Sequence, residues 1–156
     1  MHFHVIKFEK IDTPVEDFDS ELPDEDPTLL RYTDYYGEII SAEERKAVIN
    51  SNWLKYLFDG VATIDTKAET ITFLDEKTIK KSFKEYLKGL THKLADEAEK
   101  EELSGFEFRY AGVDYKDTPT LFCIDDYVQT SFSFIEDASY HANETWKFGN
   151  IFDAHF

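Results

Sequence analysis

Five histidines are the residues best suited to bind a metal ion, but their spacing along the chain is uninformative. None forms an HxxxH pair, which would place two imidazoles on one face of a helix. Two of them stand two residues apart near the start, where they would share a strand face and could meet an ion. A partly exposed strand is the simpler interpretation. The sequence therefore predicts no metal site, and the histidines are His2, His4, His92, His141 and His155.

Cys123 is the only cysteine, and with His141 and an acid at 125–126 it supplies the residue types of a nucleophile, a base and an orienting carboxylate. It lies in an apolar run, however, where a thiol usually packs as an inert small side chain. Nothing in the neighbouring sequence activates the sulfur. The sequence therefore predicts no catalytic residue and favours a non-enzymatic protein.

Two further kinds of binding motif are incomplete or absent. Asp17, Asp19 and Glu21 match the first oxygen ligands of a calcium loop. However, Leu22 stands where the sharp turn needs glycine, and Thr28 stands where the loop needs a bidentate acid. The six glycines form neither GxGxxG nor GxxxxGK, so no phosphate-binding loop is predicted. No cofactor is expected.

The charge of the chain is strongly acidic, with 33 Asp and Glu against 17 Lys and Arg and a formal net charge of -16. Residues 1–38 carry eleven acids and three bases, and residues 104–156 carry nine and three. Residues 39–103 are nearly balanced, with thirteen and eleven. A surface of this sign repels phosphate backbones and anionic lipid heads. We therefore expect a basic protein partner and no direct binding of nucleic acid or membrane.

Length and composition predict a single domain over residues 1–156. A chain of this size buries about 70% of the surface that its unfolded form exposes, which is enough to fold without disulfides or bound metal ions. Aromatic residues make up 16% of the chain, too many for a disordered acidic protein. No disulfide within the chain can form, and neither a secretory signal nor an apolar stretch of membrane-spanning length is visible. The expected location is the cytoplasm.

The acidic segment, residues 10–38, is the most distinctive stretch of the sequence. Its prolines and like charges oppose long regular structure, so we expect it to be extended on the surface. Its bulky aromatics would either pin it to the body or be presented to a partner. The residues expected to contact a partner are Glu16, Asp17, Asp19, Glu21, Asp24, Glu25, Asp26, Tyr32, Tyr35 and Tyr36. A solvated loop with its aromatics turned inward fits the same pattern.

Two amphipathic helices are predicted in the middle of the chain. Ser41 and Glu44 form a capping box, so the first helix should begin at Ala42, and Gly60 offers its stop. The second covers residues 75–104, where apolar residues recur at helical spacing and would cover a sheet. Its opposite side would be solvated, paired with acids of residues 12–26, or paired with an external acidic surface. That side carries Lys77, Lys80, Lys81, Lys84 and Lys88.

Alternation of apolar and polar residues predicts the strands, and the sequence leaves residues 136–144 open between a helical turn and a loop. The expected fold is α+β, a mostly antiparallel sheet of about five to seven strands covered by two main helices. The predicted strands are residues 2–9, a hairpin of 61–65 with 69–74, and then 106–110, 121–124, 128–135 and 145–148.

These features favour an acidic non-enzymatic binding or inhibitor protein that docks onto a basic protein surface. A nucleic-acid mimic and a toxin-neutralising protein are two versions that the sequence does not separate. One alternative is a small enzyme or ligand-binding domain with an aromatic-lined pocket between helix and sheet. Another is a homo-oligomer that buries exposed aromatics between its subunits.

Overall fold

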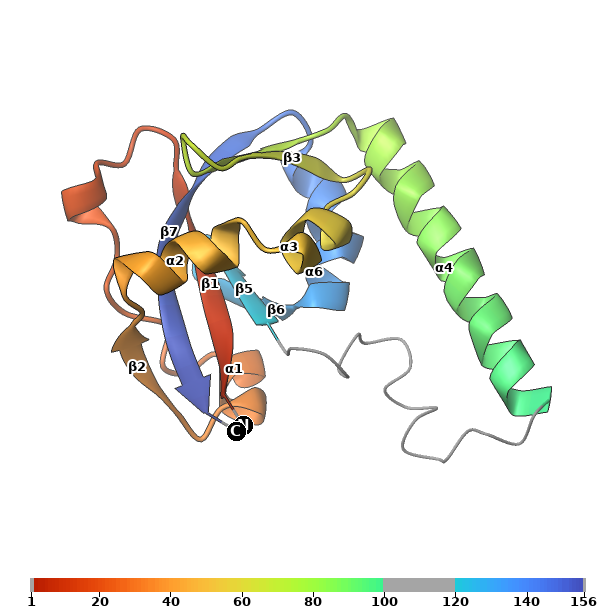
Figure 1. Ribbon diagram of the computed structural model, residues 1–156, viewed down its shortest axis with the longest axis horizontal. Helices are drawn as coiled ribbons and strands as arrows, with labels where there is room; N and C mark the ends of the chain where they lie inside the picture. The colour runs from red at the N-terminus through yellow and green to blue at the C-terminus, as the bar shows by residue number, and fades with distance from the viewer. Residues whose placement is uncertain (1, 100–119, 156) are drawn as a thin grey trace.

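The computed structural model of this protein describes residues 2–99 and 120–155 (Figure 1). Seven strands form one sheet in the order β3-β4-β7-β1-β5-β6, and β2 also pairs with β7. All of these pairings are antiparallel except that of β1 with β5. The predicted α+β class with a mostly antiparallel sheet is therefore confirmed. The strands are β1 His2–Lys10, β2 Tyr35–Ile39, β3 Ala62–Asp65, β4 Thr70–Phe73, β5 Thr120–Ile124, β6 Tyr127–Thr130 and β7 Thr145–His155.

The two central strands come from opposite ends of the described chain. On one side, β7 pairs with β1 from His2↔His155 to Lys10↔Trp146, with a register shift between Ile6 and Phe8. On its other side, β7 pairs first with β4 and then with β2. The predicted short strand 145–148 is thus the beginning of an eleven-residue strand. That strand holds the sheet together.

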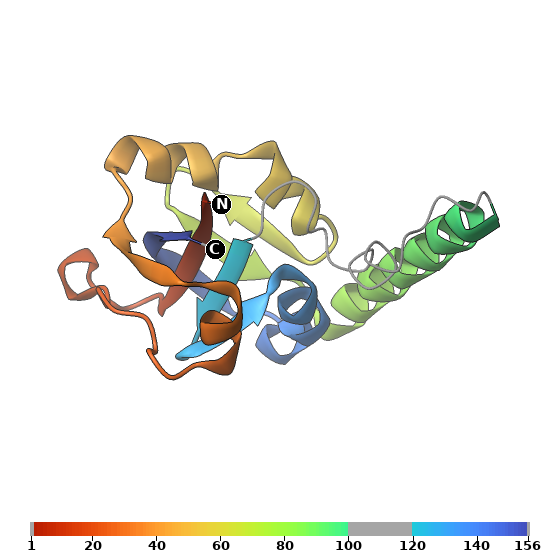
Figure 2. The same ribbon diagram turned by 90° about the horizontal axis from the view of Figure 1, so that it is seen from below.

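One face of the sheet is covered by helices and carries the larger apolar core (Figure 2). Side chains of α2 Ala42–Ile49, α3 Asn52–Leu57 and α6 Ser131–Asp137 pack there, and the rings of Phe122 and Phe134 stack with centroids 4.8 Å apart. The other face is covered by part of the acidic segment, including α1 Pro27–Tyr32. Its smaller core contains Phe3, Val5, Leu22 and Leu29.

The long helix α4 Glu76–Glu99 covers the sheet only with its first turns and then runs away from the body (Figures 1 and 2). Ile79 is buried, and Phe83 lies 5.7 Å from the ring of Phe132 on α6. The shorter helices therefore do most of the covering that the sequence assigned to two main helices. None of the helices in the described ranges has the length and apolar character needed to cross a membrane.

The expected helix from Ala42 is broken in two because a second cap intervenes. The capping box of Ser41 and Glu44 is present as predicted. The first helix ends at Ile49, and the hydroxyl of Ser51 accepts a hydrogen bond from the backbone N–H of Leu54 at 3.2 Å, which starts α3. An internal serine that caps a new helix ends the old one.

Two other predictions are wrong in part. The strand predicted over 128–135 ends at Thr130, because the Thr130 hydroxyl accepts from the backbone N–H of Ser133 at 3.3 Å and so caps α6. The acidic segment is not wholly extended, since it contains α1, β2 and the short 3-10 helix η1 Val15–Asp17. Within 136–144, η2 Ala138–His141 is a second 3-10 helix, which resolves that open alternative. The predicted strand 106–110 and residues 100–104 of the second helix lie outside the described residues.

Candidate functional site

A buried lysine organises the acidic segment. Lys7 lies on β1 with only 4% of its surface exposed. Its Nζ donates to Asp19 Oδ2 at 2.5 Å, to the carbonyl oxygen of Glu21 at 3.1 Å and to Asp126 Oδ1 at 3.2 Å. An ammonium group has three donors, so these contacts satisfy it completely. Lys7 therefore joins the acidic segment to the turn between β5 and β6.

Lys7 and its two aspartate partners stabilise one another's charged forms. Burial alone would lower the pKa of Lys7, but the hydrogen bonds to Asp19 and Asp126 outweigh it and the pKa is raised. The pKa of Asp19 is lowered, first by the hydrogen bond from Lys7 and then by the backbone N–H of Glu21. Both groups are thus charged at neutral pH. The calcium-like pattern of the sequence centres on Asp19. The carboxylate of Asp19 is already paired with a cation of the protein itself, Lys7.

Three further contacts hold the acidic segment against the sheet. Lys147 donates to the carbonyl oxygen of Thr13 at 2.8 Å, and Asn150 donates to that of Asp19 at 3.0 Å. The Asp26 carboxylate caps α1 by accepting from the backbone N–H groups of Thr28 at 2.8 Å and Leu29 at 3.1 Å. Its other oxygen accepts from the backbone N–H of β6 residue 128 at 3.1 Å. The segment is therefore fixed in one arrangement, and none of these contacts involves the lysines of α4.

Acids that are distant in sequence meet at this place. Asp125 and Asp126 both have positive φ, 49° and 59°, as a two-residue type I′ hairpin turn requires. Lys7 holds this turn beside Asp19, while the bond of Asp26 to β6 holds the turn at residues 23–26 against the same hairpin. We call the exposed acids of these three pieces the acidic face. They are Asp19, Glu21, Asp24, Glu25, Asp125 and Asp126.

The residues that the sequence assigned to partner binding fall into an exposed group and a buried or half-buried group. Asp19, Glu21, Asp24 and Glu25 lie on the acidic face, and Glu16 and Asp17 are exposed on η1. The carboxylate of Asp26, in contrast, is buried and occupied by backbone groups, so its role is structural. Tyr32 and Tyr36 are half-buried against the smaller core, which matches the inward-turned interpretation, and Tyr35 is 59% exposed on β2.

Sequence reasoning missed three members of this site: Lys7, Asp125 and Asp126. A signal for Lys7 was present, because a lysine between Ile6 and Phe8 in an apolar strand needs a buried partner. The two aspartates gave no such signal. They join the site only through the pairing of β1 with β5, which local sequence does not encode.

Comparison with known proteins does not add to this geometry. No protein-family model, curated protein or solved structure was found to match the chain. What the site can do therefore rests on its own residues. It presents fixed carboxylates and no activated nucleophile among the described residues, an arrangement that suits binding of a cation-rich surface.

An apolar cleft of about 180 Å³ lies among α3, the start of α4 and α6. Sites for small molecules usually have volumes of roughly 300–1,000 Å³, so this cleft is small for that purpose. It lies between helices, whereas the sequence placed a pocket between helix and sheet. Its lining is largely apolar, with Leu57, Val61, Phe83, Phe132 and Ile135 among the residues. A separate cavity of about 310 Å³ lies between the α3 region and β3, beside Phe58 and Ile64, so the predicted pocket between helix and sheet stays a prediction.

Cys123 and His141 lie on opposite sides of the sheet. Cys123 is fully buried in the smaller core, and burial raises its pKa to about 12. His141 lies on the other side, where its ring contacts Phe73 and its Nδ1 lies 2.9 Å from Glu144 Oε2. A thiol with this pKa is protonated at neutral pH and is a poor nucleophile. These residues therefore do not form a catalytic group.

Proposed function

We propose that this protein is a non-enzymatic binding protein that docks onto a basic protein surface through its acidic face. The observation that carries the proposal is the convergence of acids from the acidic segment and the β5–β6 turn around Lys7. Lys7 neutralises part of this charge, yet Asp126 keeps 73% of its side chain exposed and Asp19 keeps 49%. A partner can still reach both carboxylates.

The rigidity of the face supports binding. Ordering a loop on association costs free energy, and a loop that is already fixed avoids that cost. Lys7, Asp26, Lys147 and Asn150 fix the acidic segment before any partner arrives. The carboxylates can then attract a basic surface over a distance and set its orientation.

An exposed tyrosine follows the acids of the β5–β6 turn in the sequence. Tyr127 directly follows Asp126 and is 58% exposed. Tyrosine is enriched among the residues that contribute most to protein interfaces, since it buries a large ring and keeps a polar group for hydrogen bonding. Tyr127 is paired with Ile124 of the larger core, so its side chain lies on the other face of the sheet from Lys7. The proposed interface is therefore the acidic face itself, suited to a surface rich in Lys and Arg.

The test separates a localised face from net charge alone. Two variants each lose four exposed acids, so both have the same formal charge. Binding to cytochrome c and to a core histone is measured by surface plasmon resonance at low and at physiological ionic strength. The face variant is Glu21→Gln, Asp24→Asn, Glu25→Gln and Asp125→Asn, and the control is Glu38→Gln, Glu43→Gln, Asp96→Asn and Glu136→Gln.

The face variant is expected to bind roughly 30-fold more weakly, from four exposed charge pairs at about 0.5 kcal/mol each. The control variant should stay within about threefold of the wild type. Equal losses in both variants would mean that only the net charge acts, and no binding by the wild type at low salt would also overturn the proposal. A nucleic-acid mimic would in addition lose its partner to added DNA, whereas a toxin-neutralising protein need not.

A further inference from the structure

One end of the two central strands carries four potential metal ligands on one face of the sheet. His2 on β1 is paired with His155 on β7, and His4 is paired with Asp153. Residues that are directly paired, or two apart on a strand, share a face, so all four residues lie together. Sequence analysis saw only His2 and His4 and predicted no metal site. The pairing of strands from the two ends of the chain adds Asp153 and His155.

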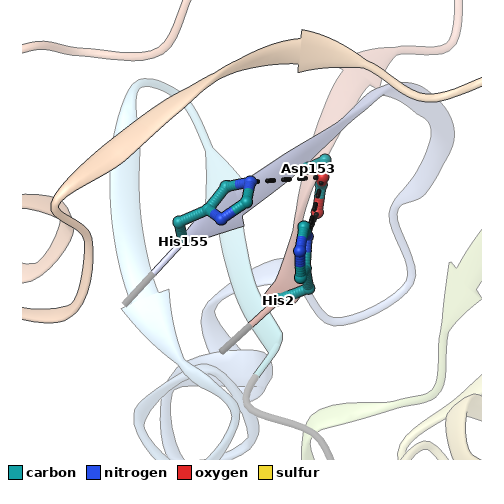
Figure 3. Close-up of side chains that lie close together, drawn as sticks. All are labelled: His2, Asp153 and His155. Carbon is teal, nitrogen blue, oxygen red and sulfur yellow. Dashed lines mark hydrogen bonds and ion pairs between the residues drawn. The ribbon is translucent and has the colours of Figure 1, made fainter.

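Three of these side chains converge at a single point (Figure 3). His2 Nδ1 lies 3.1 Å from Asp153 Oδ2, and His155 Nε2 lies 3.6 Å from the same oxygen. One donor atom from each of the three residues falls within 4.8 Å of the others, and the two imidazole rings have centroids 3.9 Å apart. We call His2, Asp153 and His155 the histidine cluster.

These separations suit a transition-metal ion. A zinc ion holds nitrogen and oxygen ligands at about 2.0–2.1 Å in a tetrahedron, which places two ligands roughly 3.3 Å apart. Both nitrogen-to-oxygen distances in the cluster lie within a few tenths of an ångström of that value. The third separation, between a nitrogen of each imidazole, is no more than 4.8 Å.

The chemistry of the donors selects the class of metal. Imidazole suits Zn²⁺, Cu²⁺, Ni²⁺ and Fe²⁺, whereas Ca²⁺ and Mg²⁺ prefer shells made of oxygen. The ligand side chains are 69%, 30% and 40% exposed for His2, Asp153 and His155. Solvent can therefore deliver the ion and complete its coordination. The combination of two histidines and one carboxylate leaves at least one position open to water.

We propose that the histidine cluster binds one divalent transition-metal ion, with Zn²⁺ as the best fit. The ion bridges the first and last strands of the sheet, because its ligands come from residue 2 on β1 and residues 153 and 155 on β7. An ion that binds only this arrangement stabilises the folded state by mass action. This inference is independent of the acidic face, which lies on other residues.

The experiment uses the full chain without an affinity tag, since tag histidines bind the same metals. Zn²⁺ binding at pH 7.5 is measured by competition with a chromophoric chelator, and Co²⁺ is added separately as a spectroscopic probe of geometry. One equivalent of Zn²⁺ is expected to bind and to raise the melting temperature by a few degrees when in excess. Co²⁺ should give the visible absorption of a site with nitrogen and oxygen ligands.

Two variants and one control distinguish the cluster from adventitious binding. Asp153→Asn preserves the size of the side chain and a hydrogen-bond acceptor but removes the charged ligand, and His155→Gln removes an exposed imidazole. Each should weaken Zn²⁺ binding at least tenfold, which corresponds to about 1.4 kcal/mol. His92→Gln, on the exposed surface of α4, should leave the Zn²⁺ affinity within twofold of that of the wild type. Circular dichroism of each apo variant checks that it folds.

Several outcomes would overturn the proposal. These are no stoichiometric binding at 100-fold molar excess of Zn²⁺, an equal loss in His92→Gln and Asp153→Asn, or an equal thermal shift with Mg²⁺. If Asp153→Asn does not fold, His155→Gln alone decides, because its side chain is 40% exposed and its loss leaves the core intact.

Discussion

Two of the places where this protein sets carboxylates against nitrogen-bearing side chains differ in the origin of the positive charge. Around Lys7 the cation is built into the chain and buried, with a 5% exposed side chain between two more exposed aspartates. In the histidine cluster the partners of Asp153 are exposed imidazoles, so a positive charge beside Asp153 requires a bound proton or a bound metal ion. One site is therefore complete by itself, and the other depends on what the solution supplies.

The difference separates two uses of acidic residues. Asp19 and Asp126 first stabilise the fold by compensating Lys7, and only their exposed sides are left for a partner. Within residues 2–99 and 120–155, Asp153 forms its ion pairs with histidines and with no lysine or arginine, and its ligand geometry suits an added cation. Mutations at the first site should therefore act on folding, and mutations at the second should act on ligand binding.

The largest expected effect comes from removal of the buried cation. Lys7→Met keeps most of the length of the side chain, but it leaves two carboxylates facing each other and removes the hydrogen bond to the Glu21 carbonyl oxygen. We expect a loss of about 2–3 kcal/mol, less than for a fully buried pair because both aspartates can be hydrated. Urea unfolding followed by tryptophan fluorescence measures it.

The matched control lies in the other region. Without metal, Asp153→Asn should change the free energy of unfolding by no more than about 0.5 kcal/mol, as is usual for pairs near the surface. If Lys7→Met and Asp153→Asn lower the free energy of unfolding equally, the contrast drawn between the two sites is wrong.

The next largest effect should come from Asp26, the acid that we expect to stabilise the fold of the acidic segment. Asp26→Ala removes the cap of α1 and the acceptor for the N–H at residue 128, and should cost about 2 kcal/mol. Asp24→Ala, two residues earlier and exposed, should leave the urea midpoint unchanged within error. A cost at Asp24 as large as that at Asp26 would show that the segment is held differently.

The smallest effect is in the acid dependence of stability. The pKa of Asp19 is lowered from its ordinary value of 3.8, so its contribution is complete above that pH and is lost as the pH falls through the lower folded pKa. The loss should be under about 1 kcal/mol, because half of this carboxylate is exposed. Unfolding midpoints between pH 5 and pH 2.5 should fall less steeply in Asp19→Asn than in the wild type. Parallel curves would contradict the assignment.

Local signals in the sequence predicted the elements that depend on neighbouring residues. The capping box at Ser41 and Glu44, the first strand and the hairpin of β3 with β4 are all as expected. The errors occurred where a local signal had a competitor. The alternating Phe132 and Phe134 predicted a strand, but the hydroxyl of Thr130 caps a helix over the same residues.

The candidate sites were harder because they depend on pairing between distant strands. Asp19 and Asp126 are separated by 107 positions and share only Lys7. His2 and Asp153 are 151 positions apart and meet through the register of β1 with β7. A single sequence contains no record of such pairings, so it indicated some of the residues and none of the geometry.

The order of the strands also has a consequence for how the protein is made. Strand β7 is the neighbour of β1, β2 and β4, yet the ribosome produces it after all of them. Until it emerges, three strands have an open edge with nothing to pair with, and such edges invite association with other chains. Folding of this sheet should therefore wait until β7 has been synthesised, and a nascent chain that stops before residue 145 should be a client of chaperones.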